Sequence, residues 1–371
     1  MRIAILSLQL NTNYGGILQA YALQTLLERL GHDVCVIDNQ AVPDIRLSDY
    51  IKVIPIRFIY KYILGKRLTL WPEQHYRHKQ YLEKSINTRR FIFEHINIRK
   101  CKSLSRLSKN EFDAIVVGSD QVWRPSYFCC WGDVTNSFLK FAKDWSIRRI
   151  SYAASFGTDK WEYSENETFA AKKLIKMFDA VSVREYDGVL LCKKYLNTDA
   201  DLVLDPTLLL TIDDYDHLIN DDNRLMEKRY LLYYCLDNSS EICTLTNNVS
   251  YSKGLIPYKI CNNERHGNSE PIENVEIWLK AFRDADFIIT DSFHACVFSL
   301  IFRKPFICIC NKSRGESRFR IFIEELGLKH NFVSKASEYV PTYNYMPKEE
   351  TYNKLSELKM HSCKFLKNSL R

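Results

Sequence analysis

The residues best placed to do chemistry lie at the start of an expected helix. Residues 285–290 (ADFIIT) have the character of a buried strand, and Asp-Ser-Phe-His at 291–294 leads into an apolar helix. Ser292 is a good N-cap, and the free N–H groups and dipole of a helix start bind anions. There His294 would donate to a bound anion or act as a general acid, with Asp291 as a candidate base. A histidine without a function is the alternative.

A second set of polar side chains follows the expected strand 112–118. Gly118, Ser119, Asp120 and Trp123 lie within six residues of sequence. This set suits a sugar, because Asp120 can accept hydrogen bonds from hydroxyls and Trp123 can stack on a pyranose face. The alternative is that Ser119 or Asp120 only caps a helix.

The loop before the first expected helix contains paired glycines. It carries Asn13, Tyr14, Gly15 and Gly16 directly after the expected strand 2–8. Glycines let the backbone come close to a ligand, and the following helix offers free N–H groups, so this loop is a candidate acceptor contact. The pattern is not G-x-G-x-x-G and does not indicate a dinucleotide. A plain glycine turn is the alternative.

Two arginines are candidates for binding an anion. Arg184 ends the expected strand 179–184, where a guanidinium can bind a carboxylate or phosphate through two hydrogen bonds. A local ion pair with Glu185 or Asp187 is the alternative. Arg318 belongs to the cationic stretch 312–320, part of which would face an anionic substrate, although solvated surface is the default.

Short apolar strands that alternate with helices must position these residues. Strands are expected over 2–8, 33–38, 112–118, 149–155, 179–184, 201–205, 230–236, 255–261, 285–290 and 305–310, and helices over 17–30, 273–283, 293–302, 321–326 and 347–368. The alternation predicts an α/β fold with two domains built on parallel sheets, whose ligands bind beyond the carboxyl ends of the strands. Residues 1–210 would form the first domain, with a basic insertion at about 45–110, and residues 211–345 the second. Residues 346–371 would form a C-terminal helix that packs across both.

Composition is typical of a globular protein without a membrane span. The 371 residues carry 52 Lys and Arg against 45 Asp and Glu, a net charge of +7, and 46% are hydrophobic. No run of about 18 apolar residues occurs, and the N-terminus lacks the layout of a signal peptide. The twelve cysteines are scattered without a C-x-x-C pair, which favours reduced thiols in a cytoplasmic protein. No metal-ligand spacing appears, so neither a metal nor another cofactor is expected.

Residues 50–71 combine positive charge with apolar side chains and contain no acidic residue. The cations of this segment are Lys52, Arg57, Lys61, Lys66 and Arg67. They favour either a peripheral segment on the inner face of the cell membrane or a basic helix that covers the first domain. No recognised nucleic-acid module surrounds them, so a nucleic-acid partner is not expected.

In the order and spacing of its short motifs, nearly the whole chain resembles the polysaccharide pyruvyl transferase family. The motifs are NTNYGGILQAYALQ at 11–24, VVGSDQVW at 116–123, SYAASFG at 151–157, VSVRE at 181–185, LDPT at 204–207, ADFIITDSFH at 285–294 and SRFR…LGL from 317 to 328.

The resemblance implies a fold similar to GT-B glycosyltransferases, with the active site between two Rossmann-like halves. It also implies transfer of a pyruvyl group from phosphoenolpyruvate to a sugar, which forms a ketal and releases phosphate. The acceptor would be a galactose- or glucose-containing glycan of an exopolysaccharide or capsule, or its polyprenyl-diphosphate-linked precursor. Family members carry Arg-Leu-His at the start of the second-domain helix, whereas this chain has Ser292-Phe293-His294. Arg184 matches the family's first-domain arginine, and Arg318 is the candidate for the missing charge.

The resulting hypothesis assigns one role to each group. Arg184, Arg318 and the helix start at Ser292 would bind the donor, which carries up to three negative charges. His294 would be the acid or the donor to the phosphate, and Asp120 or Asp291 the base. This requires His294 to lie near Arg184 rather than in an apolar interior. The alternatives are a nucleotide-sugar glycosyltransferase of the same architecture and a non-catalytic, membrane-associated assembly factor.

Overall fold

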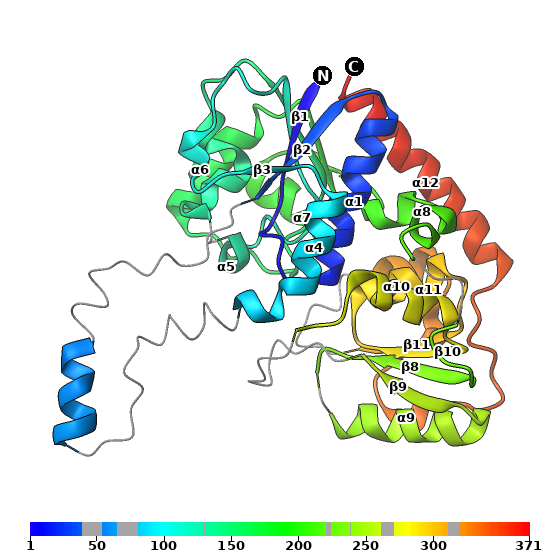
Figure 1. Ribbon diagram of the computed structural model, residues 1–371. Helices are drawn as coiled ribbons and strands as arrows, with labels where there is room; N and C mark the ends of the chain where they lie inside the picture. Colours follow the sequence, from blue (N-terminus) through cyan, green and yellow to red (C-terminus); the bar gives the residue numbers. More distant parts are fainter. Residues whose placement is uncertain are drawn as a thin grey trace.

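Two parallel sheets, each covered by helices, form the N-terminal and C-terminal halves of the molecule (Figure 1). The computed structural model describes residues 1–38, 54–64, 81–128, 131–219, 224–237, 239–260, 271–310 and 319–371. Within the described residues, all neighbouring strands pair in parallel. This confirms the predicted α/β class with two Rossmann-like halves that face each other, as in the GT-B fold.

The sheet of the N-terminal half has the strand order β3-β2-β1-β4-β5-β6-β7. Its strands are β1 (Arg2–Leu6), β2 (Asp33–Asp38), β3 (Ile98–Lys100), β4 (Ala114–Val117), β5 (Arg148–Ala154), β6 (Ala180–Val183) and β7 (Asp201–Leu202). Alternate residues of β1 enter different apolar clusters, Ile3 and Ile5 one and Ala4 and Leu6 the other, because side chains alternate across a strand. The first face is covered by α1 (Tyr14–Arg29) and α4 (Ile86–His95), the second by α6 (Glu165–Ile175) and α7 (Tyr186–Leu191).

The sheet of the C-terminal half has the order β12-β11-β10-β8-β9. Its strands are β8 (Tyr230–Tyr234), β9 (Ile256–Lys259), β10 (Phe287–Thr290), β11 (Phe306–Ile309) and β12 (Phe332–Val333). The face toward the N-terminal half is covered by α10 (Val275–Asp284) and α11 (Phe293–Ile301), and the other face by α9 (Ser240–Lys253). The division between the two sheets falls within residues 203–229, the segment that contains the predicted boundary at residue 210.

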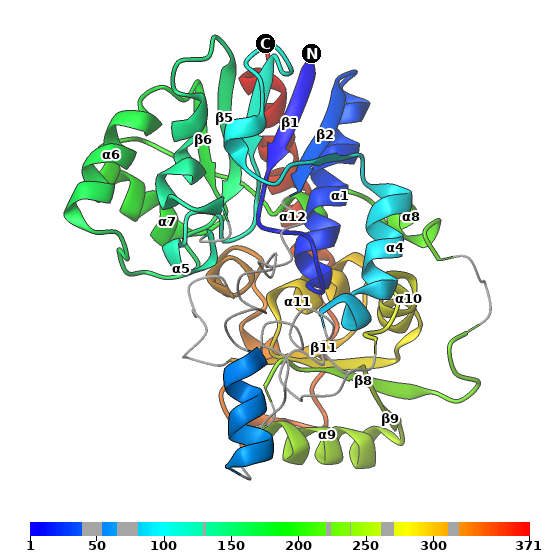
Figure 2. The ribbon, with the colours of Figure 1, turned by 60° about the vertical axis from the view of Figure 1, so that its left-hand side comes forward.

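One apolar cluster continues from the first sheet through to the second, so the two halves share a core. At its centre Tyr14, at the start of α1, stacks on Trp278 of α10 with ring centroids 5.3 Å apart. The Tyr14 hydroxyl donates to the carbonyl of Glu273 at 2.8 Å. Figures 1 and 2 both show the N-terminal end of α1 against α10 and α11. The halves are therefore held together beside the start of α1.

The C-terminal helix α12 (Glu349–Ser369) contacts both halves. Near its start, the Thr351 hydroxyl donates to the carbonyl of Leu326 in the C-terminal half. Farther along, Ser362 Oγ accepts the N–H of Leu204, which follows β7. The helix thus spans the division between the halves (Figure 1).

The segment predicted as a basic insertion at about 45–110 is not a single appendage. Its later part is integral to the first sheet, because α4 buries Phe91 and Ile92 and β3 pairs with β2. Residues 54–63 form a separate helix that ends in η1 (Ile59–Ile63), Leu64 follows it, and the rest of the segment 50–71 lies outside the described residues. No helix in the described ranges combines the length and hydropathy needed to cross a bilayer.

Removing the Trp278 ring should destabilise the whole molecule, because this side chain is fully buried between the halves. For Trp278→Ala we expect a loss of about 3–5 kcal/mol in the free energy of unfolding, measured by urea titration. Tyr251→Ala is the control, since Tyr251 is 93% exposed and its replacement should change stability by less than about 0.5 kcal/mol. Equal effects of the two variants would contradict a shared core.

Candidate active site between the two halves

His294 lies in the first turn of α11, the helix that follows β10 in the chain. Thr290, the last residue of β10, donates its hydroxyl to the carbonyl of Tyr234 and accepts the N–H of Ser292 at 3.0 Å. Ser292 occupies the predicted N-cap position, but its side chain makes no capping hydrogen bond. The β10–α11 turn is therefore fixed by Thr290, and it directs His294 toward the N-terminal half.

The imidazole of His294 and the guanidinium of Arg184 meet at one carboxylate, that of Asp205. Arg184 Nη1 lies 2.8 Å from Asp205 Oδ2, and His294 Nε2 lies 3.7 Å from the same oxygen. Arg184 also lies over the ring of Phe293, 5.1 Å from its centroid. The predicted proximity of His294 to Arg184 is thus present, with the two residues supplied by different halves.

Arg184 is fully buried and surrounded by carboxylates. Besides Asp205, its guanidinium faces Glu185 at 3.6 Å and Asp120 at 3.7 Å. Burial alone would lower the pKa of Arg184, but the three carboxylates outweigh it and raise the pKa. Its Nε and Nη2 atoms have no hydrogen-bond partner among the described residues. Arg184 therefore keeps two buried donor atoms without a hydrogen bond within the described part of the chain, and its positive charge is already balanced.

Asp205 is the site residue that we did not single out from the sequence. Its carboxylate accepts hydrogen bonds from Gln19 of α1 and from the backbone N–H and hydroxyl of Thr207. Burial alone would raise the pKa of Asp205, but the facing His294, Arg184 and the Thr207 hydroxyl hold it well below its usual range. The available signal was the position of the LDPT motif at the carboxyl end of an expected strand.

Gly15 allows α1 to approach the imidazole closely. A Cβ atom on Gly15 would lie 2.1 Å from His294 Nδ1, whereas one on Gly16 would lie 3.2 Å from Asp120 Oδ2. The paired glycines were predicted to let the backbone approach a ligand, and in this structure both come close to side chains. For Gly15, however, the group that comes close is a side chain of the other half.

A pocket of about 300 Å³ lies beside Asp120. It is lined by Ser7, Leu8, Gln9, Leu10, Asn11, Asn13, Gly16, Ile17, Asp120, Ser126 and Tyr127. Asn13, Gly16 and Asp120 are thus predicted site residues that line a cavity. The remaining side chains come from the loop after β1, from Ile17 of α1 and from α5 (Pro125–Phe128).

Trp123 does not have the role that we expected. It is completely buried, donates its indole N–H to the carbonyl of Ser137 at 3.1 Å and stacks on Phe138. A covered indole has no face left for a pyranose, so the sugar-stacking prediction is wrong for Trp123. The sequence pattern did not reveal this, because the residues that cover the ring come from the later segment 137–156.

Most of the other predicted site residues make contacts that stabilise the fold. Tyr14 belongs to the contact between the halves, and Gly118 packs under α1, where an added Cβ would lie 3.1 Å from Ile5. Ser119 is buried, and its hydroxyl has no hydrogen-bond partner in the described part of the chain. Asp291 accepts the N–H groups of Leu236 and Asp237, so it anchors the end of β8. Arg318 lies outside the described residues.

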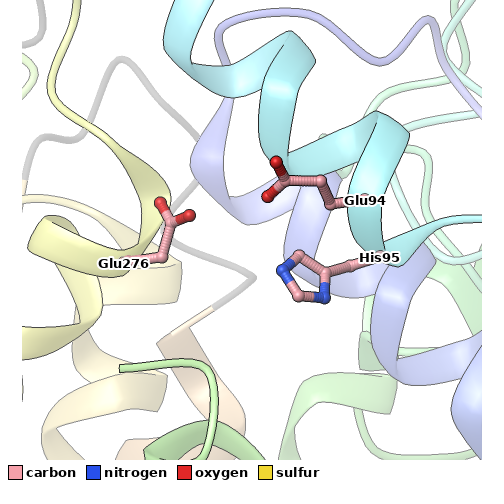
Figure 3. Close-up of side chains that lie close together, drawn as sticks. All are labelled: Glu94, His95 and Glu276. Carbon is pink, nitrogen blue, oxygen red and sulfur yellow. The ribbon is translucent and has the colours of Figure 1, made fainter. Parts of the chain in front are cut away.

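A further cluster of ionisable side chains, which includes none of the predicted site residues, joins α4 to α10. Figure 3 shows Glu94 and His95 of α4 opposite Glu276 of α10, with ligand-type atoms all within 4.8 Å of one another. Arg90 donates to Glu276 at 3.0 Å and thereby supplies a positive charge to the cluster. We therefore interpret it as an ion-pair contact between the halves.

The contact between Gly15 and His294 can be tested by a double-mutant cycle. Gly15→Ala should lower the free energy of unfolding by about 1–3 kcal/mol, because its Cβ would overlap the imidazole, although alanine normally favours a helix over glycine. In the His294→Ala background the same replacement should have little or no cost. Thermal or urea unfolding of the four proteins measures this coupling, and an equal cost in both backgrounds would refute the contact.

Comparisons with known proteins identify the family to which the chain belongs. Solved structures similar to this one include UDP-GlcNAc 2-epimerase from Methanocaldococcus jannaschii, at 12% identity and a TM-score of 0.47, with 97% of this chain and 100% of that chain covered. MurG from Acinetobacter baumannii matches at 10% identity and a TM-score of 0.40, with 98% and 94% covered. Among curated proteins, a search with the sequence finds no match. A family model described as polysaccharide pyruvyl transferase matches residues 13–313, and the chain therefore belongs to the polysaccharide pyruvyl transferase family.

Proposed function

We propose that this protein transfers the pyruvyl group of phosphoenolpyruvate to two hydroxyls of a galactose or glucose unit in a surface polysaccharide or its lipid-linked precursor. Family membership supports a transferase that acts in polysaccharide biosynthesis. The observation that carries the proposal is the meeting of His294 and Arg184 at Asp205. It brings an imidazole together with guanidinium N–H groups that have no hydrogen-bond partner among the described residues.

The reaction needs proton transfers at defined atoms. A proton added to the methylene carbon of phosphoenolpyruvate makes its central carbon electrophilic, and one sugar hydroxyl attacks there. The second hydroxyl then forms the other C–O bond as the bond to phosphate breaks. Of the two protons that the hydroxyls release, one replaces the proton taken up by the methylene carbon and the other leaves with phosphate. His294 would supply the proton or donate to the phosphate, and Asp120 would accept from a hydroxyl. We favour Asp120 over Asp291 as the base because only Asp120 lines the pocket.

Charge balance determines which cationic groups of the protein are available to bind the anionic donor. Three carboxylates already balance Arg184, and Arg320 is paired with Asp187 and Glu324. A trianionic donor therefore requires additional positive charge, which we assign to Arg318 and the neighbouring cations of residues 312–318, together with the start of α11. The proposal requires neither a metal nor another cofactor.

The proposed reaction is tested with phosphoenolpyruvate and a galactose- or glucose-terminated acceptor. Phosphate release and a product heavier by one pyruvyl ketal are expected, and His294→Ala should lower kcat by about 10²–10⁴-fold. His361→Ala is the matched control, because His361 is exposed on α12. Phosphoenolpyruvate should also raise the melting temperature. Protection by a nucleoside diphosphate instead, with no ketal formed, would favour the glycosyltransferase alternative.

We further propose that the helix at residues 54–63 contacts an anionic membrane, which would bring the enzyme to a lipid-linked acceptor. Its apolar side chains face solvent: Phe58 is 52% exposed, Ile56 57% and Ile63 71%. The segment 50–71 adds five cations and no acidic residue. Exposed apolar groups combined with positive charge are typical of helices that lie in the interface of anionic bilayers.

Flotation with vesicles tests the membrane contact. The protein should float with vesicles that contain phosphatidylglycerol, bind less at high salt and bind little to neutral phosphatidylcholine, because charge and apolar burial both contribute. Phe58→Ser combined with Ile63→Ser should abolish flotation without changing the melting temperature. Tyr251→Ser is the control for an exposed ring elsewhere. Flotation that does not depend on lipid charge, or that survives the double replacement, would contradict the proposal.

A further inference from the structure

The pocket beside Asp120 lies at the switch point of the first sheet. From β1 the chain proceeds to β2 on one side, whereas β4 leads to β5 on the other, and β1 and β4 are neighbours. The crevice beyond the carboxyl ends of two such strands is the usual ligand position in open parallel sheets. The loop after β1 supplies Ser7 and Gln9 to this pocket, and the loop after β4 supplies Asp120.

The lining of the pocket suits an uncharged, hydroxyl-rich molecule. Its described side chains include neutral amides and hydroxyls and a single carboxylate, and they include no Lys, Arg or His. The Nε2 donor of Gln9 is buried and has no hydrogen-bond partner among the described residues. The described lining offers no counter-charge to a phosphorylated carboxylic acid, whereas sugar hydroxyls can both donate to a carboxylate and accept from an amide.

Tyr127 supplies the exposed aromatic ring that Trp123 cannot. It lines the pocket, is 49% exposed, and its ring is contacted by Arg124, whose guanidinium carbon lies 5.0 Å from the ring centroid. Arg124 is itself held by an ion pair with Glu162 at 3.2 Å. A partly exposed ring, contacted by Arg124, therefore lines a pocket of about 300 Å³, a volume at the lower end for small-ligand sites.

Asp120 connects this pocket to the Arg184–His294 site. One of its oxygens, Oδ1, lies 3.7 Å from Arg184 Nη2, while Oδ2 faces the backbone of Gly16 in the pocket lining. We infer that this pocket is the subsite for the neutral hexose unit of the acceptor, with Tyr127 and Gln9 as the residues that determine sugar binding. The inference rests on the proposed function and separates the sugar from the anionic donor, with Asp120 between them.

Binding of methyl α-galactoside and methyl α-glucoside, followed by saturation-transfer NMR, tests the subsite without requiring turnover. At least one glycoside should bind, and galacturonate should bind at least tenfold more weakly, because the pocket offers Asp120 and no described cation. Tyr127→Ala and Gln9→Ala should each weaken glycoside binding about tenfold or more. In the transferase assay, both variants should raise the acceptor KM and leave the KM for phosphoenolpyruvate unchanged. Tyr251→Ala should change neither.

The outcomes separate this inference from the proposed reaction. Ketal formation with an acceptor KM that is unaffected by Tyr127→Ala and Gln9→Ala would overturn the subsite and leave the function standing. Glycoside binding that is lost in both variants, without any ketal formation by the intact protein, would support the subsite and refute the function. Tighter binding of galacturonate than of the neutral glycosides would overturn the subsite.

Discussion

The carboxylate of Asp205 is the contact on which the candidate site depends, because basic side chains from both halves face it. It lies 2.8 Å from Arg184 of the N-terminal half and 3.7 Å from His294 of the C-terminal half. A buried charge is tolerated only where partners compensate its desolvation, and here Thr207 and Gln19 supply further hydrogen bonds. The site therefore exists only while the two halves are packed together. Their shared apolar cluster and α12 maintain that packing.

Three consecutive residues at the start of α1 link this packing to the chemistry. Tyr14 stacks on Trp278, Gly15 faces the imidazole of His294, and Gly16 lies beside Asp120. One helix start thus contacts the interface, the candidate proton donor and the candidate base. A displacement of α1 would alter all of these contacts together, since cores of this density transmit small shifts.

Electrostatics divides the proposed site into two regions. Around Arg184 the three carboxylates leave no surplus positive charge, so an anionic donor depends on the helix start and on cations that follow β11. The pocket beyond Asp120 is neutral apart from that carboxylate within its described lining. This difference would direct an anion and a sugar to opposite sides of Asp120, with the acceptor hydroxyls next to the base.

The sequence by itself determined the parallel strands and which polar residues follow them. Buried parallel strands are short apolar runs, and their carboxyl ends share one edge of a sheet, so the pattern of residues alone was enough to place Asp120, Arg184 and His294 beyond the carboxyl ends of strands. The tertiary structure alone decided that Trp123 is core and that Asp205 joins the two halves. Those outcomes depend on partners far away in the chain: Trp123 is covered by Phe138 and Phe156, and Asp205 meets His294 across the interface. Local pattern specifies how a segment folds, whereas the exposure of a side chain is set by whatever packs against it.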